Sequence, residues 1–122
     1  MLGGSKGTIY VVDDDLPVRD SLRALLETCG YEVKVYSDGE DFLRNADASG
    51  ADCLLVDMDM PRVGGRQLLE RLRDAGITTP AIVLTTNGKR MGPRWERAQV
   101  FAVISKPVAS DELLRLLDRI CC

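Results

Sequence analysis

The chain of 122 residues contains no histidine. This absence excludes a Ser-His-Asp triad, a Cys-His pair and a histidine general base, so any chemistry must depend on carboxylates, hydroxyls, lysine or a metal. The four cysteines, Cys29, Cys53, Cys121 and Cys122, form no CxxC pair, and without histidine a zinc site is not expected. Cys29 and Cys53 fall on apolar faces, and we interpret them as small core residues.

The chain also lacks an apolar run of the ~20 residues that are needed to cross a bilayer. Its first residues, MLGGSKG, do not have the basic-then-apolar order of a signal peptide, so we expect a cytoplasmic protein that is not bound to a membrane. The formal net charge is −3 and the basic residues are spread along the chain, which gives no indication of nucleic-acid binding. We expect one domain over residues 1–122, with a flexible N-terminus over residues 1–7.

What the sequence does contain is a regular alternation of short apolar runs and helical patterns. Strands are expected at 8–12, 31–36, 53–57, 81–85 and 101–105. Helices are expected from Pro17 to Cys29, after an S-x-x-E capping box at 37–40, over 65–75, and after Ser110. Between the last two strands, Gly88, Gly92 and Pro93 leave room only for a short or irregular helix over 93–99.

This alternation predicts a parallel sheet with helices on both faces, because parallel strands need crossover connections. In such sheets, ligands bind outside the carboxyl ends of the strands. Polar side chains stand at or just after four of these ends, and they are Asp13 and Asp14, Asp57, Thr85, and Lys106. We therefore expect three acids, a hydroxyl and an ammonium to meet at one edge of the sheet.

Carboxylates that converge repel one another unless a cation joins them, and hard oxygen ligands favour Mg²⁺. A divalent ion beside Asp57 would screen an incoming phosphoryl group and allow the carboxylate to act as a nucleophile. Lys106 could contact phosphoryl oxygens through its positive charge, and Thr85 through its hydroxyl. The pattern indicates an aspartyl-phosphate site in which Asp57 is the acceptor.

These residues resemble the receiver domain of two-component response regulators, over nearly the whole chain. The matching pieces are VVDDD at 11–15, VDMDMP at 56–61 followed by Gly65, VLT at 83–85 and SKP at 105–107. The resemblance implies an α/β, flavodoxin-like receiver fold, which is a doubly wound five-stranded parallel sheet of order 2-1-3-4-5. The region before the last strand implies an atypical fourth helix.

By this resemblance, Asp57 takes a phosphoryl group from a sensor histidine kinase or a phosphotransfer protein, and the chain is not an enzyme with a substrate to turn over. The resemblance also implies that Mg²⁺ is bound by Asp13, Asp14, Asp57 and the backbone carbonyl of Asp59, with Asp13 acting through a water molecule.

The resemblance further implies that Lys106 contacts the phosphoryl group and that its bond to Pro107 is cis. Thr85 would follow the phosphoryl group and change an output surface formed by the fourth helix, the fifth strand and the fifth helix. Partners on that surface could be a downstream protein, a fused output domain or a second copy of the chain. Whether the chain is a complete regulator or a receiver from a longer protein stays open.

Three features depart from the family pattern. Val103 stands where the family usually has Tyr or Phe, although Phe101 lies on the same face of the expected strand. Thr86 replaces a small residue beside the phosphate site, which indicates narrower access. Gln99 and Val100 replace the usual Gly-Ala pair before the last strand, so the output surface is the least transferable part of the resemblance.

Two other interpretations remain open. The first is a receiver-like adaptor that binds a partner and is no longer phosphorylated. The second is a phosphatase of the haloacid-dehalogenase type, since Asp57 and Asp59 form a DxD pair. That pair follows the third expected strand and not the first, which argues against the phosphatase.

Overall fold

Five short strands form a single parallel sheet in a computed structural model that describes residues 5–86 and 98–121. Their order across the sheet is β2-β1-β3-β4-β5, and each neighbouring pair is parallel. The strands are β1 (Thr8–Val12), β2 (Glu32–Tyr36), β3 (Cys53–Asp57), β4 (Ala81–Thr85) and β5 (Ala102–Ser105). The expected doubly wound sheet and its strand order are confirmed.

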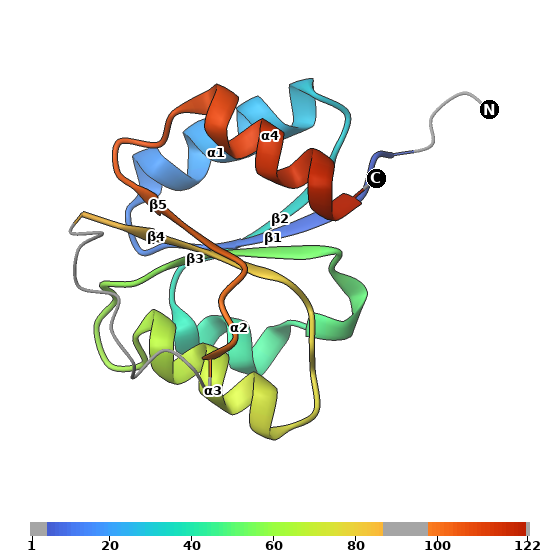
Figure 1. Ribbon diagram of the computed structural model, residues 1–122. Coiled ribbons are helices and arrows are strands. Elements are labelled where there is room, and N and C mark those ends of the chain that lie inside the picture. Colours follow the sequence, from blue (N-terminus) through green and yellow to red (C-terminus); the bar gives the residue numbers. More distant parts are fainter. Residues whose placement is uncertain (1–4, 87–97, 122) are drawn as a thin grey trace.

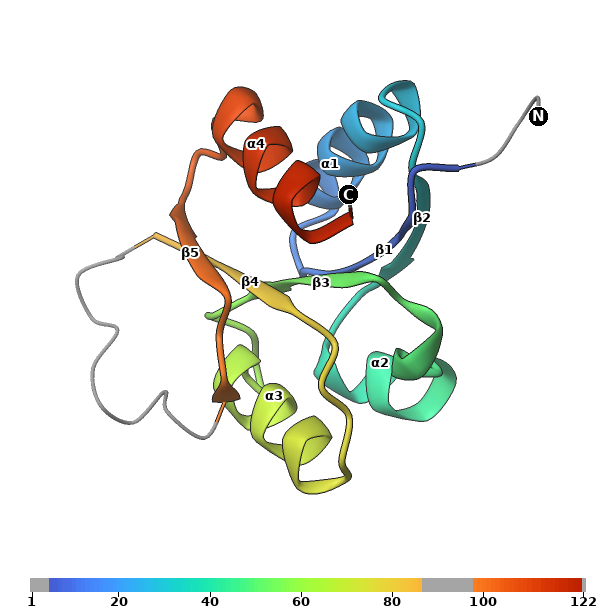
Figure 2. The same cartoon turned by 45° about the vertical axis from the view of Figure 1, so that its right-hand side comes forward.

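Helices cover both faces of this sheet (Figure 1). On one face lie α1 (Leu16–Thr28) and α4 (Ser110–Cys121), and on the other lie α2 (Gly39–Asn45) and α3 (Gly65–Asp74), as the turned view in Figure 2 also shows. A short 3-10 helix, Ala48–Gly50, leads into β3. The fourth helix of the family pattern, expected at 93–99, falls almost wholly outside the described residues, and α4 corresponds to the fifth.

The sheet divides the hydrophobic core into two clusters because successive strand residues point to opposite faces. Along β1, Ile9 and Val11 pack under α1 and α4, whereas Tyr10 and Val12 pack under α2 and α3. All five residues of β3 are buried, as expected for a central strand of a parallel sheet. Cys53 has no exposed surface and is a core residue, as expected.

The starts of the helices show where local sequence decides the structure. Asp15 is the N-cap of α1, as its position in the acidic run suggests, and its carboxylate accepts a hydrogen bond from the Val18 N–H at 3.5 Å. The N-cap of α2 lies one residue later than expected, and the two hydrogen bonds there do not form a full capping box. Asp38, not Ser37, is the N-cap and accepts from the Asp41 N–H at 2.7 Å, while the Asp41 carboxylate accepts from the Ser37 N–H at 2.9 Å.

At the β2 edge of the sheet, exposed and half-buried residues alternate, with Glu32 and Lys34 exposed. The pairing of this edge begins ahead of β1, within the segment expected to be flexible. There the Lys6 N–H donates to the Gly30 carbonyl at 2.9 Å, and the Glu32 N–H donates to the Gly7 carbonyl at 2.9 Å. In the part of the chain that the structure describes, no helix has the length and apolar character to cross a bilayer.

Candidate functional site

The polar residues singled out in the sequence meet at the edge where the parallel strands end, on the left in Figure 1. Asp13 directly follows β1, Asp57 ends β3 and Thr85 ends β4. The sheet register sets Asp57 opposite Leu84 and Thr85 opposite Ser105, directly before Lys106. This convergence follows from the parallel topology, because every strand delivers its carboxyl end to the same edge.

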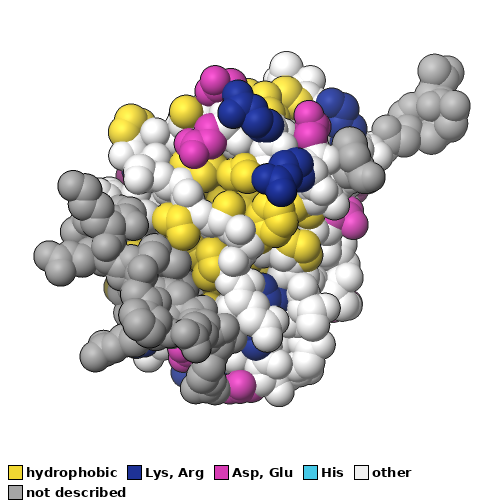
Figure 3. Space-filling view, in the orientation of Figure 1, with side chains coloured by type: hydrophobic (Ala, Val, Ile, Leu, Met, Phe, Trp, Pro, Cys, Tyr) yellow, Lys and Arg dark blue, Asp and Glu magenta, His cyan; other side chains and the backbone are white. Residues whose placement is uncertain are grey.

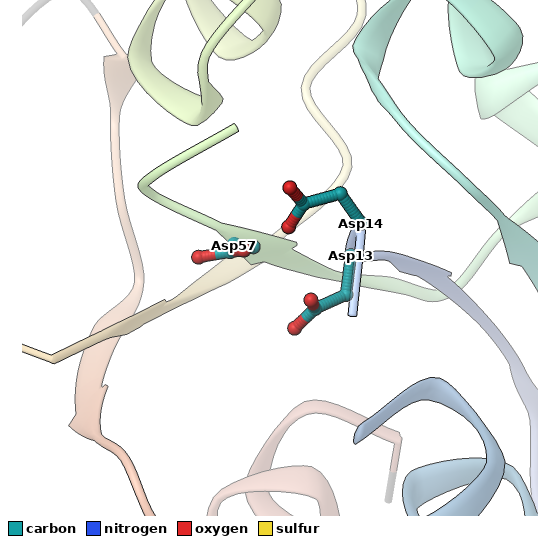
Figure 4. Close-up of side chains that lie close together, drawn as sticks. All are labelled: Asp13, Asp14 and Asp57. Carbon is teal, nitrogen blue, oxygen red and sulfur yellow. The ribbon is translucent and has the colours of Figure 1, made fainter. Parts of the chain in front are cut away.

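Three carboxylates form the centre of the site. One oxygen atom from each of Asp13, Asp14 and Asp57 can be chosen so that all three lie within 4.8 Å of one another. Figure 4 shows the side chains of Asp13 and Asp14 directed to the side on which Asp57 lies. Asp13 has no exposed surface and Asp57 is 3% exposed, whereas Asp14 faces solvent. The cluster therefore has a buried base and an open side.

Asp13 is fixed through its backbone and its side chain. Its N–H donates to the Tyr36 carbonyl at 3.2 Å, which continues the pairing of β1 with β2. Its Oδ1 accepts from the Asp15 N–H at 2.9 Å, and its carbonyl accepts from Nη1 of Arg19 at 2.7 Å. Each polar group so engaged costs less to bury than it would alone.

Asp57 is held equally firmly at the end of the central strand. The next residue, Met58, donates its N–H to the Leu84 carbonyl at 2.8 Å, so the pairing with β4 extends beyond the strand. Oδ1 of Asp57 accepts from the Asp59 N–H at 3.0 Å. A side chain at Gly65 would place its Cβ 2.6 Å from the Asp57 carbonyl oxygen, so this close approach of α3 requires glycine.

Lys106 brings a positive charge to the cluster. Its Nζ lies 3.0 Å from Oδ2 of Asp13 and 3.5 Å from Oδ2 of Asp57. Its backbone N–H donates to the Thr85 carbonyl at 2.7 Å, which ties the loop after β5 to the end of β4. The bond between Lys106 and Pro107 is cis, as expected.

The electrostatics of the cluster favour a bound cation. The pKa of Asp57 is raised to about 7, mainly by burial and also by the charge of Asp13, while the hydrogen bond from the Asp59 N–H and the charge of Lys106 oppose the rise. For Lys106, burial alone would lower the pKa, but its close pairing with the carboxylates of Asp13 and Asp57 raises it. One ammonium thus only partly offsets the repulsion among the carboxylates.

The donor set also fits a hard divalent ion. Oδ2 of Asp13 is buried and, although ion-paired with Lys106, it has no hydrogen bond of good geometry to any described residue. Carboxylate oxygens around an open side suit Mg²⁺, which keeps several of its waters. Asp13, Asp14 and Asp57 could hold such an ion through their side chains. That the backbone carbonyl of Asp59 binds Mg²⁺ stays a prediction. The exposed side-chain carboxylate of Asp59 accepts a hydrogen bond from Oγ1 of Thr86 at 3.5 Å.

Phe101, a candidate substitute for the aromatic residue that Val103 replaces, lies far from the site. Phe101 donates its N–H to the carbonyl of Ala81, the first residue of β4, so it lies at the opposite end of the sheet from Lys106. It is 43% exposed and contacts Arg119 of α4 instead of the acidic cluster.

Arg19 contacts the site, yet the sequence pattern did not single it out. Its only sequence signal is a basic residue in the first turn of a helix that follows an acidic loop.

The sequence of this chain matches the family profile of the response regulator receiver domain over residues 9–118. The chain belongs to this family. The receiver domain is 35% identical over 113 residues to the transcriptional regulatory protein TdiR of Thauera aromatica, a match that covers 91% of this chain and 49% of TdiR. It spans about half the length of the curated relatives that it matches.

Solved structures show the same receiver fold. The response regulator StyR superposes with a TM-score of 0.86 at 32% identity, over 93% of this chain and 58% of that one. The response regulator TrrA of Thermotoga maritima, solved in complex with Mg²⁺-BeF, superposes with a TM-score of 0.83 at 25% identity, over 93% of this chain and 97% of that one. The acidic pocket of Asp13, Asp14 and Asp57 is of the kind typical of phosphoacceptor response regulators, which are signalling domains and not conventional enzymes.

Proposed function

We propose that the domain accepts a phosphoryl group on Asp57 and thereby changes the surface that it presents to a partner. The observation that carries this proposal is the meeting of three carboxylates within 4.8 Å, with the Lys106 ammonium 3.5 Å from Asp57. Membership of the receiver family supports it. The donor would be a sensor histidine kinase or a phosphotransfer protein.

In the proposed reaction, a carboxylate oxygen of Asp57 attacks phosphorus. A P–O bond to Asp57 forms while the P–N bond of the donor phosphohistidine breaks, and the imidazole leaves with the electron pair and takes up a proton. A base on this chain is not needed for the attack, because the deprotonated carboxylate of Asp57 has no proton to lose when it bonds to phosphorus. The rigid hold on Asp57 from Met58 and Asp59 keeps the acceptor in place during the attack.

Asp13, Asp14 and Asp57, with the Asp59 carbonyl, would hold Mg²⁺, which when bound would neutralise the carboxylates and the phosphoryl oxygens. The Lys106 ammonium would move from the carboxylates to the phosphoryl group, and the Thr85 hydroxyl would donate to it. Both residues stand at strand ends that are linked by the Lys106 N–H and the Thr85 carbonyl at 2.7 Å. A change at the phosphoryl group would therefore reach both β4 and β5.

For the responding surface, we propose the face formed by β5 and α4. Figure 3 shows hydrophobic side chains gathered between α4 and β5, among charged groups on the outer side of the helix. Phe101 is exposed there, and Leu116 and Ile120 are only partly buried. A downstream protein, a fused output domain or a second copy of the chain could bind to it, and we assign no nucleic-acid binding to this domain. We also propose a cytoplasmic location, in keeping with Cys29 and Cys53, which form no disulfide among the described residues.

Incubation of the purified protein with Mg²⁺ and a small acyl phosphate, followed by intact-mass measurement, tests the acceptor. We expect the parent protein to gain the mass of one phosphoryl group. The Asp57→Asn variant should show no such gain. An adduct that survives Asp57→Asn, or the absence of any adduct on the parent, would contradict the proposal. The second result would favour the adaptor that is not phosphorylated.

Asp59→Asn is the matched control, because it neutralises the second acid of the DxD pair and keeps the backbone carbonyl. A receiver should still form the adduct when Asp59 is changed in this way. A phosphatase that uses Asp59 as its acid and base should instead lose turnover of a phosphomonoester. Release of phosphate from such a substrate by the parent would favour the phosphatase.

A further inference from the structure

Arg19 stands in an unusual place for a basic residue. It lies in the first turn of α1, where the helix dipole favours negative charge and disfavours a cation. Its guanidinium nevertheless turns back to the site, and Nη1 donates to the Asp13 carbonyl at 2.7 Å, a short and charge-assisted hydrogen bond. Its backbone N–H donates to the Asp15 carbonyl at 3.0 Å. That bond is the first hydrogen bond of the helix, so Arg19 is fixed in α1 while its side chain reaches back to the end of β1.

The acceptor of this bond determines how the acidic loop is arranged. The Asp13 carbonyl belongs to the peptide unit that joins Asp13 to Asp14, so a rotation of this peptide changes the backbone torsions of both acids, ψ of Asp13 and φ of Asp14. Asp13 is fully buried and lies beyond the end of β1. Without the guanidinium, its carbonyl would lose this partner, and rotation of the peptide to regain one would move the carboxylates.

From this geometry we infer that Arg19 is a positioning residue for the metal site, which orients the carboxylates of Asp13 and Asp14 for a divalent cation through the peptide between them. The inference rests on the proposed function, because it assigns a role toward the same Mg²⁺ site. Arg19 itself touches neither the metal nor the phosphoryl group in this role. It acts as the outer partners of metal ligands generally do, by fixing their direction.

The sign of the effect separates positioning from charge. The guanidinium is a cation near a cation site, so its charge alone weakens Mg²⁺ binding, and removing it would tighten binding. Positioning has the opposite consequence, because loss of the hydrogen bond would weaken binding. Arg19→Met removes both the charge and the hydrogen bond. Arg19→Lys keeps the charge but loses the planar group that reaches the carbonyl.

Isothermal titration of Mg²⁺ into the parent and the variants tests this inference without any phosphoryl transfer. We expect Arg19→Met to weaken Mg²⁺ binding about tenfold, as loss of an outer partner of a metal ligand does, and Arg19→Lys to weaken it as well. Arg23→Met is the matched control. It lies on the same helix and pairs only with Glu27 among the described residues, at 3.3 Å, and it should bind Mg²⁺ like the parent.

Binding by Arg19→Met that equals or exceeds that of the parent would overturn the inference and leave the proposed phosphoacceptor intact. Weakening by Arg23→Met to the same extent would also overturn it, since the effect would then follow from a general disturbance of α1 and not from the hydrogen bond to the Asp13 carbonyl. If the parent itself binds no Mg²⁺, the proposed function fails as well. Circular dichroism of each variant without metal checks that the variant folds. If Arg19→Met does not fold, the test rests on Arg19→Lys. Mg²⁺ binding by Arg19→Lys as tight as that of the parent would then overturn the inference.

Discussion

At the scale of single residues, the site brings carboxylates together with less positive charge than would balance them. Asp57 and Asp13 are both buried, and Lys106 is the one described cation that is ion-paired with them. Buried carboxylates that repel one another make the metal-free protein less stable than it could be. If the proposed function is right, this loss of stability accompanies the ability to bind a cation and a phosphoryl group.

This cost should depend on pH in a definite direction. The pKa of Asp57 is raised to about 7 from 3.8, so between these values the folded state holds a proton that the unfolded state has lost. Stability must then fall as the pH rises through this range. In metal-free solution, we expect Asp57→Asn to raise the melting temperature of the protein more at about pH 8 than at about pH 4.

Melting curves of the parent and of Asp57→Asn at both pH values, with a chelator present, provide the measurement. Adding Mg²⁺ at the higher pH should reduce the difference between the two proteins, because a bound cation offsets the repulsion in the parent. An equal gain in melting temperature at both pH values would contradict the raised pKa.

The meeting of polar residues from several strand ends could be predicted from the sequence, because parallel strands bring their carboxyl ends to the same edge. Asp13, Asp14, Asp57 and Lys106 could be placed at one edge from the parallel topology alone. Arg19 could not, since its hydrogen bond goes to a backbone carbonyl, and no pattern of side-chain types encodes that acceptor. Contacts from side chains to the backbone depend on the path of the loop, which only the structure shows.

At the scale of helices and strands, the sequence predicted which elements are present more reliably than the residues at which they begin and end. The alternation of apolar runs located every described strand, while the start of α2 was misplaced by one residue. Ser37 and Glu40 match the capping-box pattern, but in the structure Asp38 is the N-cap and the Asp41 carboxylate accepts from the Ser37 N–H, one residue before the cap. Serine and aspartate are both favoured at the N-cap, so the sequence offers two adjacent candidates of similar strength.

The consequence can be measured by comparing adjacent acids of α2. Asp41→Ala removes acceptors for the Ser37 N–H and the Asn45 amide and should lower the free energy of unfolding by about 1 kcal/mol. Glu40→Ala, which removes only an exposed ion pair with Arg62, should cost less than about 0.5 kcal/mol. Urea denaturation of both variants tests this order, and an equal or larger loss in Glu40→Ala would contradict it.

The pH dependence of the Asp41 effect has the opposite sign to that of Asp57. The backbone hydrogen bond from Ser37, followed by that from Asn45, lowers the pKa of Asp41. Its stabilising effect is therefore complete above the ordinary pKa of an aspartate and is lost as the pH falls through the lowered value. The difference between the parent and Asp41→Ala should accordingly shrink in acid.

At the scale of the whole molecule, the central strand connects the site to both halves of the core. β3 ends in Asp57 and is buried along its entire length between two hydrophobic clusters. Its first residue, Cys53, has no exposed surface, and burial raises the pKa of its thiol. Any event that exposes Cys53 must therefore separate the sheet from the helices over it.

Thiol labelling can use Cys53 to report global unfolding. In a protein with Cys29, Cys121 and Cys122 changed to serine, we expect labelling of Cys53 to be at least about a thousandfold slower than in denaturant. In the matched protein that keeps only the half-buried Cys29, labelling should be much faster. Comparable rates for the two native proteins would show that β3 opens without unfolding of the domain.

The β2 edge of the sheet carries charges that bear on aggregation. Along β2, the exposed positions carry Glu32 and Lys34, one acid and one base at alternate residues. Charged side chains on an edge strand hinder the addition of a foreign strand, because pairing would bring them against a neighbouring chain and strip them of water. The charges therefore protect the β2 edge against growth into larger sheets, without a segment that covers this edge.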